Sequence, residues 1–157
     1  MATNSNSEMG KIIEDIKKCD MLKNIEIKKL VDVDDGYAYV IAKNLVCKKS
    51  ENLNTNQLRK FFTAIRKIEQ KEKWVDVKSD FYLLKPRIAV SVGRGNVPKP
   101  FFDLIIACMN KVDVGSEEEK MDNLDIFIEF FEAIVAYHKY FENLKEDKKR
   151  EKRRNRR

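Results

Sequence analysis

The chain has 157 residues, which suits one domain and is enough to bury a hydrophobic core without disulfide or metal staples. Hydrophobic residues make up 43% of it and charged residues 37%, and five Gly with three Pro are too few for a many-turned β sandwich, so composition favours a soluble helical protein. The net charge of +6 resides in residues 145–157, which hold nine Lys or Arg and three acids, so the rest of the chain is neutral overall.

Other features of the composition exclude several classes of protein. The MATNSNS start lacks the basic and apolar regions of a signal peptide, and the most apolar segment, 126–137, carries Glu129 and Glu132, so we expect a cytoplasmic protein without a membrane span. The cysteines are odd in number, widely spaced and without a C-x-x-C, which argues against a disulfide framework or a zinc site. We expect all three to be small core residues: Cys19, Cys47 and Cys108.

The first fifty residues predict two helices. After a polar leader, 1–8, that we expect to be disordered, the apolar spacing over 9–19 predicts a short amphipathic helix. Residues 21–33 are ambiguous, because their Ile and Val side chains suit either a strand or a further turn of helix. Asp34 can cap a helix over 34–49, which ends in two lysines that suit a helix C-terminus.

Residues 54–71 predict a helix with an apolar seam and a basic back. Asn54 and Gln57 have the spacing of a capping box. The seam recurs at helical spacing: Leu58, Phe61, Phe62, Ile65 and Ile68. Four cations fall on the other sides, with no acid between them: Arg59, Lys60, Arg66 and Lys67. Uncompensated charges on one helix suit a polyanion, although a solvated basic face on a core helix gives the same pattern.

Proline and glycine punctuate the next part of the chain. We expect a helix over 79–93, with residues 74–75 in the connection before it. Pro86 either kinks this helix or moves its start to the preceding residue, and Gly93 is a plausible stop. The following helix begins between Pro98 and Pro100.

Charge is segregated in the second half of the chain. Residues 81–102 contain no acid, whereas 113–132 contain eight acids and one Lys. A body with a basic and an acidic side can bind an anion on one and a basic protein, or its own next copy, on the other. Arg87 and Arg94 are seven residues apart and so share a helical face, with Lys85 one turn away; the alternative is that they pair with the acids of the last helix.

Ser116 and Glu119 have the spacing of a second capping box, which opens the longest helix. Two apolar stripes run along it, one through His138 and the other through Phe130 and Tyr137. A helix that is apolar on two sides is either buried centrally or shared between chains. We expect Phe130 and Tyr137 to mediate self-association, as a filament or a dimer, while the acidic first turns meet the basic surface of the next copy.

No motif supports catalysis or metal binding. No motif places a Cys or Ser beside His138, so we expect it to be a hydrogen-bonded core residue. The acids that follow Ser116 have the distribution of a solvated helix start. G-R-G at 93–95 lacks the third glycine and the preceding strand of a phosphate-binding loop. We therefore expect no enzyme, no cofactor and no metal.

Three segments are informative together: NTNQLRKFFTAIRKI at 54–68, LLKPRIAVSVGR at 83–94 and FFEAIVAYHKYF at 130–141. In this order they resemble the small helical subunit of type III-A CRISPR (Csm) effector complexes. The first resembles that family's Thr-rich cap followed by Gln, an aliphatic residue, Arg and two aromatics. The second is similar to its Leu-Lys-Pro-basic segment ending in Gly-Arg, although the family more often has Tyr and small residues at 90–92, and the third resembles its closing helix. Residues 1–50 and the tail match only in being helical or variable.

The resemblance implies an all-α single domain, a bundle of about five to six helices over 9–144 followed by the basic tail 145–157. It implies several copies stacked as a filament, with guide RNA, target RNA and other type III-A subunits as partners in antiviral defence, and no nuclease activity. Such a subunit holds RNA by its backbone. The candidate RNA contacts are Arg59, Lys60, Arg66, Lys67, Lys85, Arg87, Arg94 and Lys139. The alternative is a helical adaptor whose charges serve solubility or a protein partner. RNA-dependent retention of the protein at low salt, lost steeply as the salt concentration rises, would distinguish RNA binding from this alternative.

Overall fold

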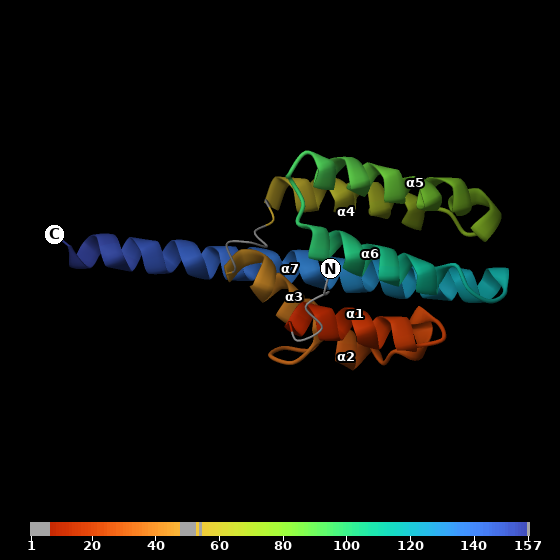
Figure 1. Cartoon of the computed structure of the whole chain (residues 1–157), viewed down its shortest axis with the longest axis horizontal. Coiled ribbons are helices and arrows are strands. Elements are labelled where there is room, and N and C mark those ends of the chain that lie inside the picture. Colours follow the sequence, from red (N-terminus) through yellow and green to blue (C-terminus); the bar gives the residue numbers. More distant parts are fainter. Residues whose placement is uncertain (1–6, 48–52, 54, 157) are drawn as a thin grey trace.

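Helices make up the regular structure of the chain in the computed structural model, which describes residues 7–47, 53 and 55–156 (Figure 1). In these ranges the elements are α1 Glu8–Lys18, η1 (a 3-10 helix) Leu22–Asn24, α2 Ile27–Val31, α3 Tyr37–Cys47, α4 Thr55–Glu69, α5 Trp74–Gly93, α6 Lys99–Val112 and α7 Glu117–Asn155. The prediction of an all-α single domain is confirmed. Residues 21–33, which were ambiguous, form η1 and α2, and these short pieces raise the number of helices above the expected count.

The long helix α7 is the centre of the bundle. Helices α3, α4 and α6 pack on it, and so does η1. Figure 1 shows α4 and α5 on one side of the molecule and α1 and α2 on the other, with the last part of α7 extending beyond the bundle. Phe127, Phe131 and His138 of the first apolar stripe are buried, and Phe130 of the second is only 1% exposed. The helix is therefore apolar on two sides because its own chain surrounds it.

This burial corrects one expected role. Phe130 belongs to the core and has no side-chain surface left for a second copy of the chain. Tyr137 is half-buried, its hydroxyl donates to the Val31 carbonyl at the end of α2, and its ring meets that of Tyr39 edge-on at 5.3 Å. Both side chains are thus engaged within the chain.

Helix α5 begins earlier than its sequence suggests. Residues 74–75, expected in a connection, form its first turn, and the indole of Trp74 is buried with Lys120 of α7 5.4 Å from its ring. Lys73 precedes the helix without a side-chain cap, so burial of Trp74 and Val77 sets this start rather than a capping motif. Pro86 lies inside the helix, where it cannot donate the usual backbone hydrogen bond to the carbonyl four residues earlier, that of the exposed Tyr82. The expected end at Gly93 is confirmed.

Helix α3 also begins elsewhere than expected. Its first residue is Tyr37, and Asp34, the expected cap, lies in the preceding turn with a φ of 72°. Gly36 is required in that turn, because a Cβ there would lie 2.2 Å from the carbonyl oxygen of Asp32. The Asn54 cap of α4 and the two lysines at 48–49 lie outside the described residues.

Two helix starts agree with the sequence. Pro98 is the N-cap of α6, with Pro100 in its first turn, and Ser116 forms the expected capping box with Glu119 at the start of α7.

The cysteines differ from one another: Cys108 is buried, Cys19 is half-buried and Cys47 is exposed, so the expectation of a core residue is wrong for Cys47. None of the three is in a disulfide.

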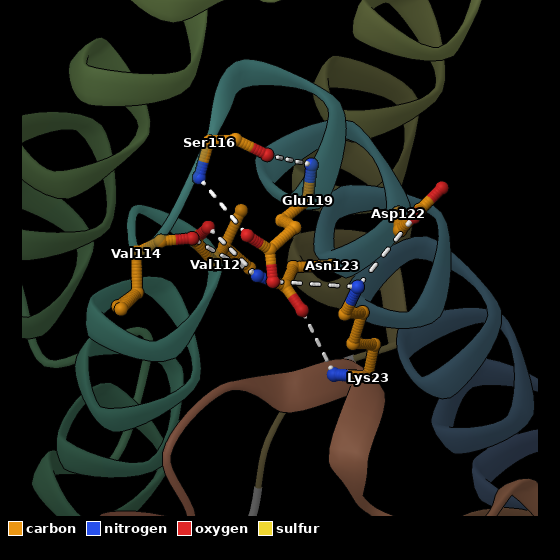
Figure 2. A network of polar contacts seen from close by, with 7 residues as sticks. All are labelled: Lys23, Val112, Val114, Ser116, Glu119, Asp122 and Asn123. Atoms are coloured by element: carbon orange, nitrogen blue, oxygen red, sulfur yellow. Dashed lines mark hydrogen bonds and ion pairs between the residues drawn. The ribbon is translucent and has the colours of Figure 1, made fainter.

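A buried polar network ties η1 to the start of α7 (Figure 2). The fully buried amide of Asn123 accepts a hydrogen bond from the Lys23 backbone N–H at 2.9 Å and donates to the carbonyls of Val112 at 3.2 Å and Val114 at 3.5 Å. The Lys23 ammonium lies 3.5 Å from Glu119 and 3.8 Å from Asp122. One side chain therefore holds three segments together, the ends of α6 and η1 and the first turns of α7.

Candidate nucleic-acid interface

The basic back of α4 is exposed because its other side belongs to the core. Leu58, Ile65 and Ile68 are buried, and the rings of Phe61 and Phe62 lie 5.2 Å and 5.8 Å from that of Phe131 on α7. These contacts fix the rotation of the helix about its axis. The opposite positions then face solvent: Arg59, Lys60 and Lys67. Within the chain as described, none of these three has an acidic partner.

Arg66 differs from its three neighbours. Its guanidinium lies 3.7 Å from Glu69 on the same helix and 3.9 Å from Glu132 on α7, and 5.6 Å from the centre of the Phe62 ring. The expectation that no acid neutralises this cation is therefore wrong. Both acids are partly exposed, so the pairs can be exchanged for another anion at small energetic cost.

The cations of α5 have few partners. The Lys85 ammonium donates to the Asn110 side chain at 3.3 Å, whereas Arg87 and Arg94 are exposed and pair with no carboxylate of the described chain. The alternative that these arginines pair with the acids of the last helix is thus not realised. Arg94 is the C-cap of α5 and keeps a helical backbone conformation.

Most of these residues gather at one end of the α4–α5 pair. Because α4 and α5 run antiparallel beside each other, the start of α4 with Arg59 and Lys60 lies at the same end of this pair as Arg87 and Arg94 (Figure 1). Lys67 lies nearer the turn between the two helices.

The lysine on α7 belongs to the same end. Lys139 is exposed and lies one turn before Glu142, whose carboxylate accepts a hydrogen bond from the Thr55 hydroxyl at the start of α4. The structure thus brings Lys139 near the beginning of α4, although the two are about eighty residues apart in the sequence. Six of the eight candidate cations are left exposed without an ion pair in the described part: Arg59, Lys60, Lys67, Arg87, Arg94 and Lys139.

His138 has the environment of a structural residue. It is fully buried, and its Nε2 lies 3.0 Å from the carbonyl oxygen of Leu53. Burial lowers its pKa, and the neighbouring Glu142 at 4.0 Å opposes this shift only in part. The expectation of a hydrogen-bonded core histidine is confirmed.

No group of three or more His, Cys, Asp or Glu side chains in the described residues is arranged to hold a metal ion. Over 7–47 and 55–156, no helix has both the length and the apolar character that crossing a membrane requires.

The sequence reasoning missed one exposed feature. Four large apolar side chains on the outer side of α5 face solvent: Val75, Tyr82, Leu83 and Val90. Pairs of them are seven residues apart, about two turns, but only the start of α5 at Trp74 places Val75 in the same helix as the others.

Comparison with known proteins identifies the family. The family model for Csm2 Type III-A matches residues 25–143, from the end of η1 through the packed part of α7. No curated protein and no solved structure that was compared matches the chain. The match covers well over half of the chain and includes every candidate RNA-contacting residue, while α1 and the basic tail lie outside it. The chain therefore belongs to the Csm2 family, a small subunit of the type III-A CRISPR Csm effector complex.

Proposed function

We propose that this protein is a non-catalytic small subunit that holds guide RNA and target RNA by their sugar-phosphate backbones in a cytoplasmic type III-A antiviral complex. The observation that carries the proposal is the cluster of exposed cations without ion pairs on α4 and α5. Phosphates are the natural partners of such charges, because charge-assisted hydrogen bonds to phosphate need no base recognition.

Backbone binding suits this surface better than base recognition does. Reading single-stranded bases requires exposed aromatic side chains on which bases stack. The two aromatic residues of α4, Phe61 and Phe62, instead pack on Phe131 inside the bundle. The described residues of α4 thus carry charge but no freely exposed aromatic ring, and base pairing between guide and target supplies the sequence discrimination.

The C-terminal part of α7 is an accessory RNA-binding arm in this proposal. The helix continues to Asn155, and the side chains from Asn143 onward are exposed as it leaves the bundle (Figure 1). Nine of the residues 145–157 are Lys or Arg, which attract any phosphate backbone whatever its sequence.

The distribution of charge along the molecule supports the stacking of copies. The acidic first turns of α7, with Glu117, Glu118 and Asp122, lie at one end of the molecule, and the basic arm extends from the other (Figure 1). A contact between unlike ends of successive copies does not close on itself and generates a filament. This head-to-tail arrangement replaces the expected contact through Phe130.

The test uses two lysines two turns apart on α4, in the assembled complex carrying a guide RNA. Lys60→Glu together with Lys67→Glu should flatten the plot of log affinity for target RNA against log salt by about one to two units per copy. Target affinity of the wild-type complex should then fall roughly tenfold further than that of the variant between about 50 and about 200 mM salt.

The matched control lies on the opposite side of the bundle. Lys11→Glu with Lys18→Glu on α1 has the same spacing and the same change in charge, and both lysines are exposed (Figure 1). The slope of log affinity against log salt for this α1 variant should equal that of the wild type. If the α4 variant and this control give the same slope as the wild type, the helical adaptor is the better description.

A further inference from the structure

Two side chains of α7 bind the chain where α4 begins. The Nε2 atom of His138 lies 3.0 Å from the carbonyl oxygen of Leu53, two positions before the helix. One turn later on the same side of α7, the carboxylate of Glu142 accepts a hydrogen bond from the hydroxyl of Thr55, the first residue of α4. Figure 1 shows that α4 begins near the point where α7 leaves the bundle. The bonded residues are 85 and 87 positions apart in the sequence, so only the folded bundle forms these contacts.

The hydrogen bonds assign the proton of the His138 ring. The ring is fully buried, its Nδ1 atom has no partner in the described residues, and its Nε2 atom faces a carbonyl, which can only accept. Burial lowers the pKa of His138, so the ring is neutral at pH 7 and its one N–H, on Nε2, donates to Leu53. The backbone N–H of Leu53 donates in turn to the Leu45 carbonyl of α3 at 3.2 Å. Both backbone polar groups of this buried residue are therefore fixed.

Glu142 acts on the first turn of α4 in two ways. It accepts the Thr55 hydrogen bond, and it places a negative charge beside a helix N-terminus, where the first backbone N–H groups lack helical partners and the helix dipole favours an anion. The side chains at 55–57 are polar, and the apolar seam begins only at Leu58. Core packing therefore fixes α4 from Leu58 onward, while the contacts with α7 hold its first turn.

The first turn in turn sets the direction of two exposed cations. Arg59 and Lys60 follow Thr55 by about one turn, and their backbone N–H groups bond to carbonyls of the first turn. We propose that Glu142 and His138 are positioning residues for RNA binding, which act by holding the first turn of α4 so that Arg59 and Lys60 face phosphate. This inference rests on the proposed function, because the positioned groups are the proposed phosphate contacts.

Thr55→Val tests the positioning without changing any charge, because it removes the hydroxyl and nearly keeps the shape of the side chain. In the full chain, hydrogen exchange at the Arg59 and Lys60 amides should be at least about tenfold faster, since a hydrogen bond to a charged group contributes about that factor to the closed state. Exchange at Ile65 and Ile68 should stay unchanged. In the assembled complex with a guide RNA, affinity for target RNA should fall roughly two- to tenfold, with the fraction of molecules whose first turn is formed. Thr55→Ser keeps the hydroxyl and should restore both.

Glu142→Ala separates positioning from electrostatics. By charge alone, removing an acid beside the RNA surface strengthens binding, whereas loss of positioning weakens it. We expect affinity for target RNA to fall as it does for Thr55→Val. The matched control is Glu146→Ala, which removes the same charge one turn further along α7 at an exposed position without an ion pair in the described residues. This control should bind target RNA as tightly as the wild type or more tightly.

A pair of substitutions tests the second contact. His138→Leu removes the donor to Leu53, whereas His138→Gln keeps an N–H that can reach the same carbonyl. Below the melting temperature of both variants, the Gln variant should bind target RNA more tightly than the Leu variant. Equal affinities remove His138 from the positioning role.

The outcomes separate this inference from the proposed function. If Lys60→Glu with Lys67→Glu flattens the salt dependence but Thr55→Val and Glu142→Ala bind target RNA like the wild type, positioning is overturned and the proposed function stands. If the lysine variant changes nothing, the proposed function fails and positioning for RNA fails with it. Exchange that speeds up equally at Arg59 and Ile65 in Thr55→Val shows global unfolding, and tighter binding by Glu142→Ala shows an effect of charge alone; either result overturns the positioning role.

Discussion

Replacing Asn123 by Ala should destabilise the chain strongly, although no apolar core residue is changed. The substitution removes the partner of the partly buried Lys23 N–H at 2.9 Å and of the buried Val112 carbonyl at 3.2 Å, together with a longer bond to Val114 at 3.5 Å (Figure 2). Each of the two shorter bonds is worth about 1 to 2 kcal/mol, because its backbone partner is left buried or partly buried without a replacement. The higher helix propensity of alanine offsets roughly 0.5 kcal/mol of this loss in the free energy of unfolding. The expected net loss is about 1.5 to 3.5 kcal/mol.

Urea denaturation followed by far-UV circular dichroism measures this loss. Asn143→Ala is the matched control, since it is the same change on the same helix at an exposed position and should leave stability unchanged or raise it slightly. Lys23→Ala separates the two parts of the network, because it removes the ion pairs of the ammonium with Glu119 and Asp122 but keeps the backbone N–H. Its effect should be small, since those pairs are partly exposed.

The reasoning fails if Asn123→Ala and Asn143→Ala unfold at the same urea concentration. It also fails if Lys23→Ala costs as much as Asn123→Ala, because the ion pairs and not the buried amide would then hold η1 to α7.

The other predictions concern His138, Phe130 and the arm. Because burial lowers the pKa of His138, the unfolded chain binds a proton that the folded chain does not, so stability should fall as pH drops below about 6.5. His138→Gln should reduce this fall. If the free energy of unfolding, measured by urea denaturation, drops equally for both proteins between about pH 7.5 and about pH 5.5, this prediction is contradicted. Phe130→Ser should cost about 3 to 5 kcal/mol of folding stability, and an unchanged melting temperature with lost assembly would restore its role between copies. Deleting residues 148–157 should leave the melting temperature unchanged but weaken RNA binding at low salt; a lower melting temperature would show that the arm is structural.

Local signals predicted several elements correctly. The apolar seam from Leu58 to Ile68 defined α4, and the Ser116 capping box marked the start of α7, because both depend on residues within a few positions of each other. The start of α5 was missed for the opposite reason. Lys73 provides no cap, and what holds the first turn is burial of Trp74 beneath Lys120, a residue of another helix.

The features of the candidate site likewise separate into those that depend on local sequence and those that depend on other helices. The sequence alone determined that α4 is basic opposite its seam, since helical geometry puts Lys60 and Lys67 on the outside whatever the helix packs against. It also determined the family, through three ordered segments in the matched region 25–143. Only the tertiary structure decided that Arg66 has Glu132 beside it, because that acid comes from α7.

Tertiary structure likewise decided which apolar stripes are free. The spacing of apolar residues on α7 was compatible with an interface through Phe130, and the spacing on α5 did not indicate that its outer apolar side chains are exposed. Periodicity shows which side chains share a face of a helix, but not whether the chain itself covers that face. Here the bundle surrounds α7 on both apolar sides and leaves the outer side of α5 uncovered (Figure 1), because the number and arrangement of neighbouring helices is a property of the whole fold.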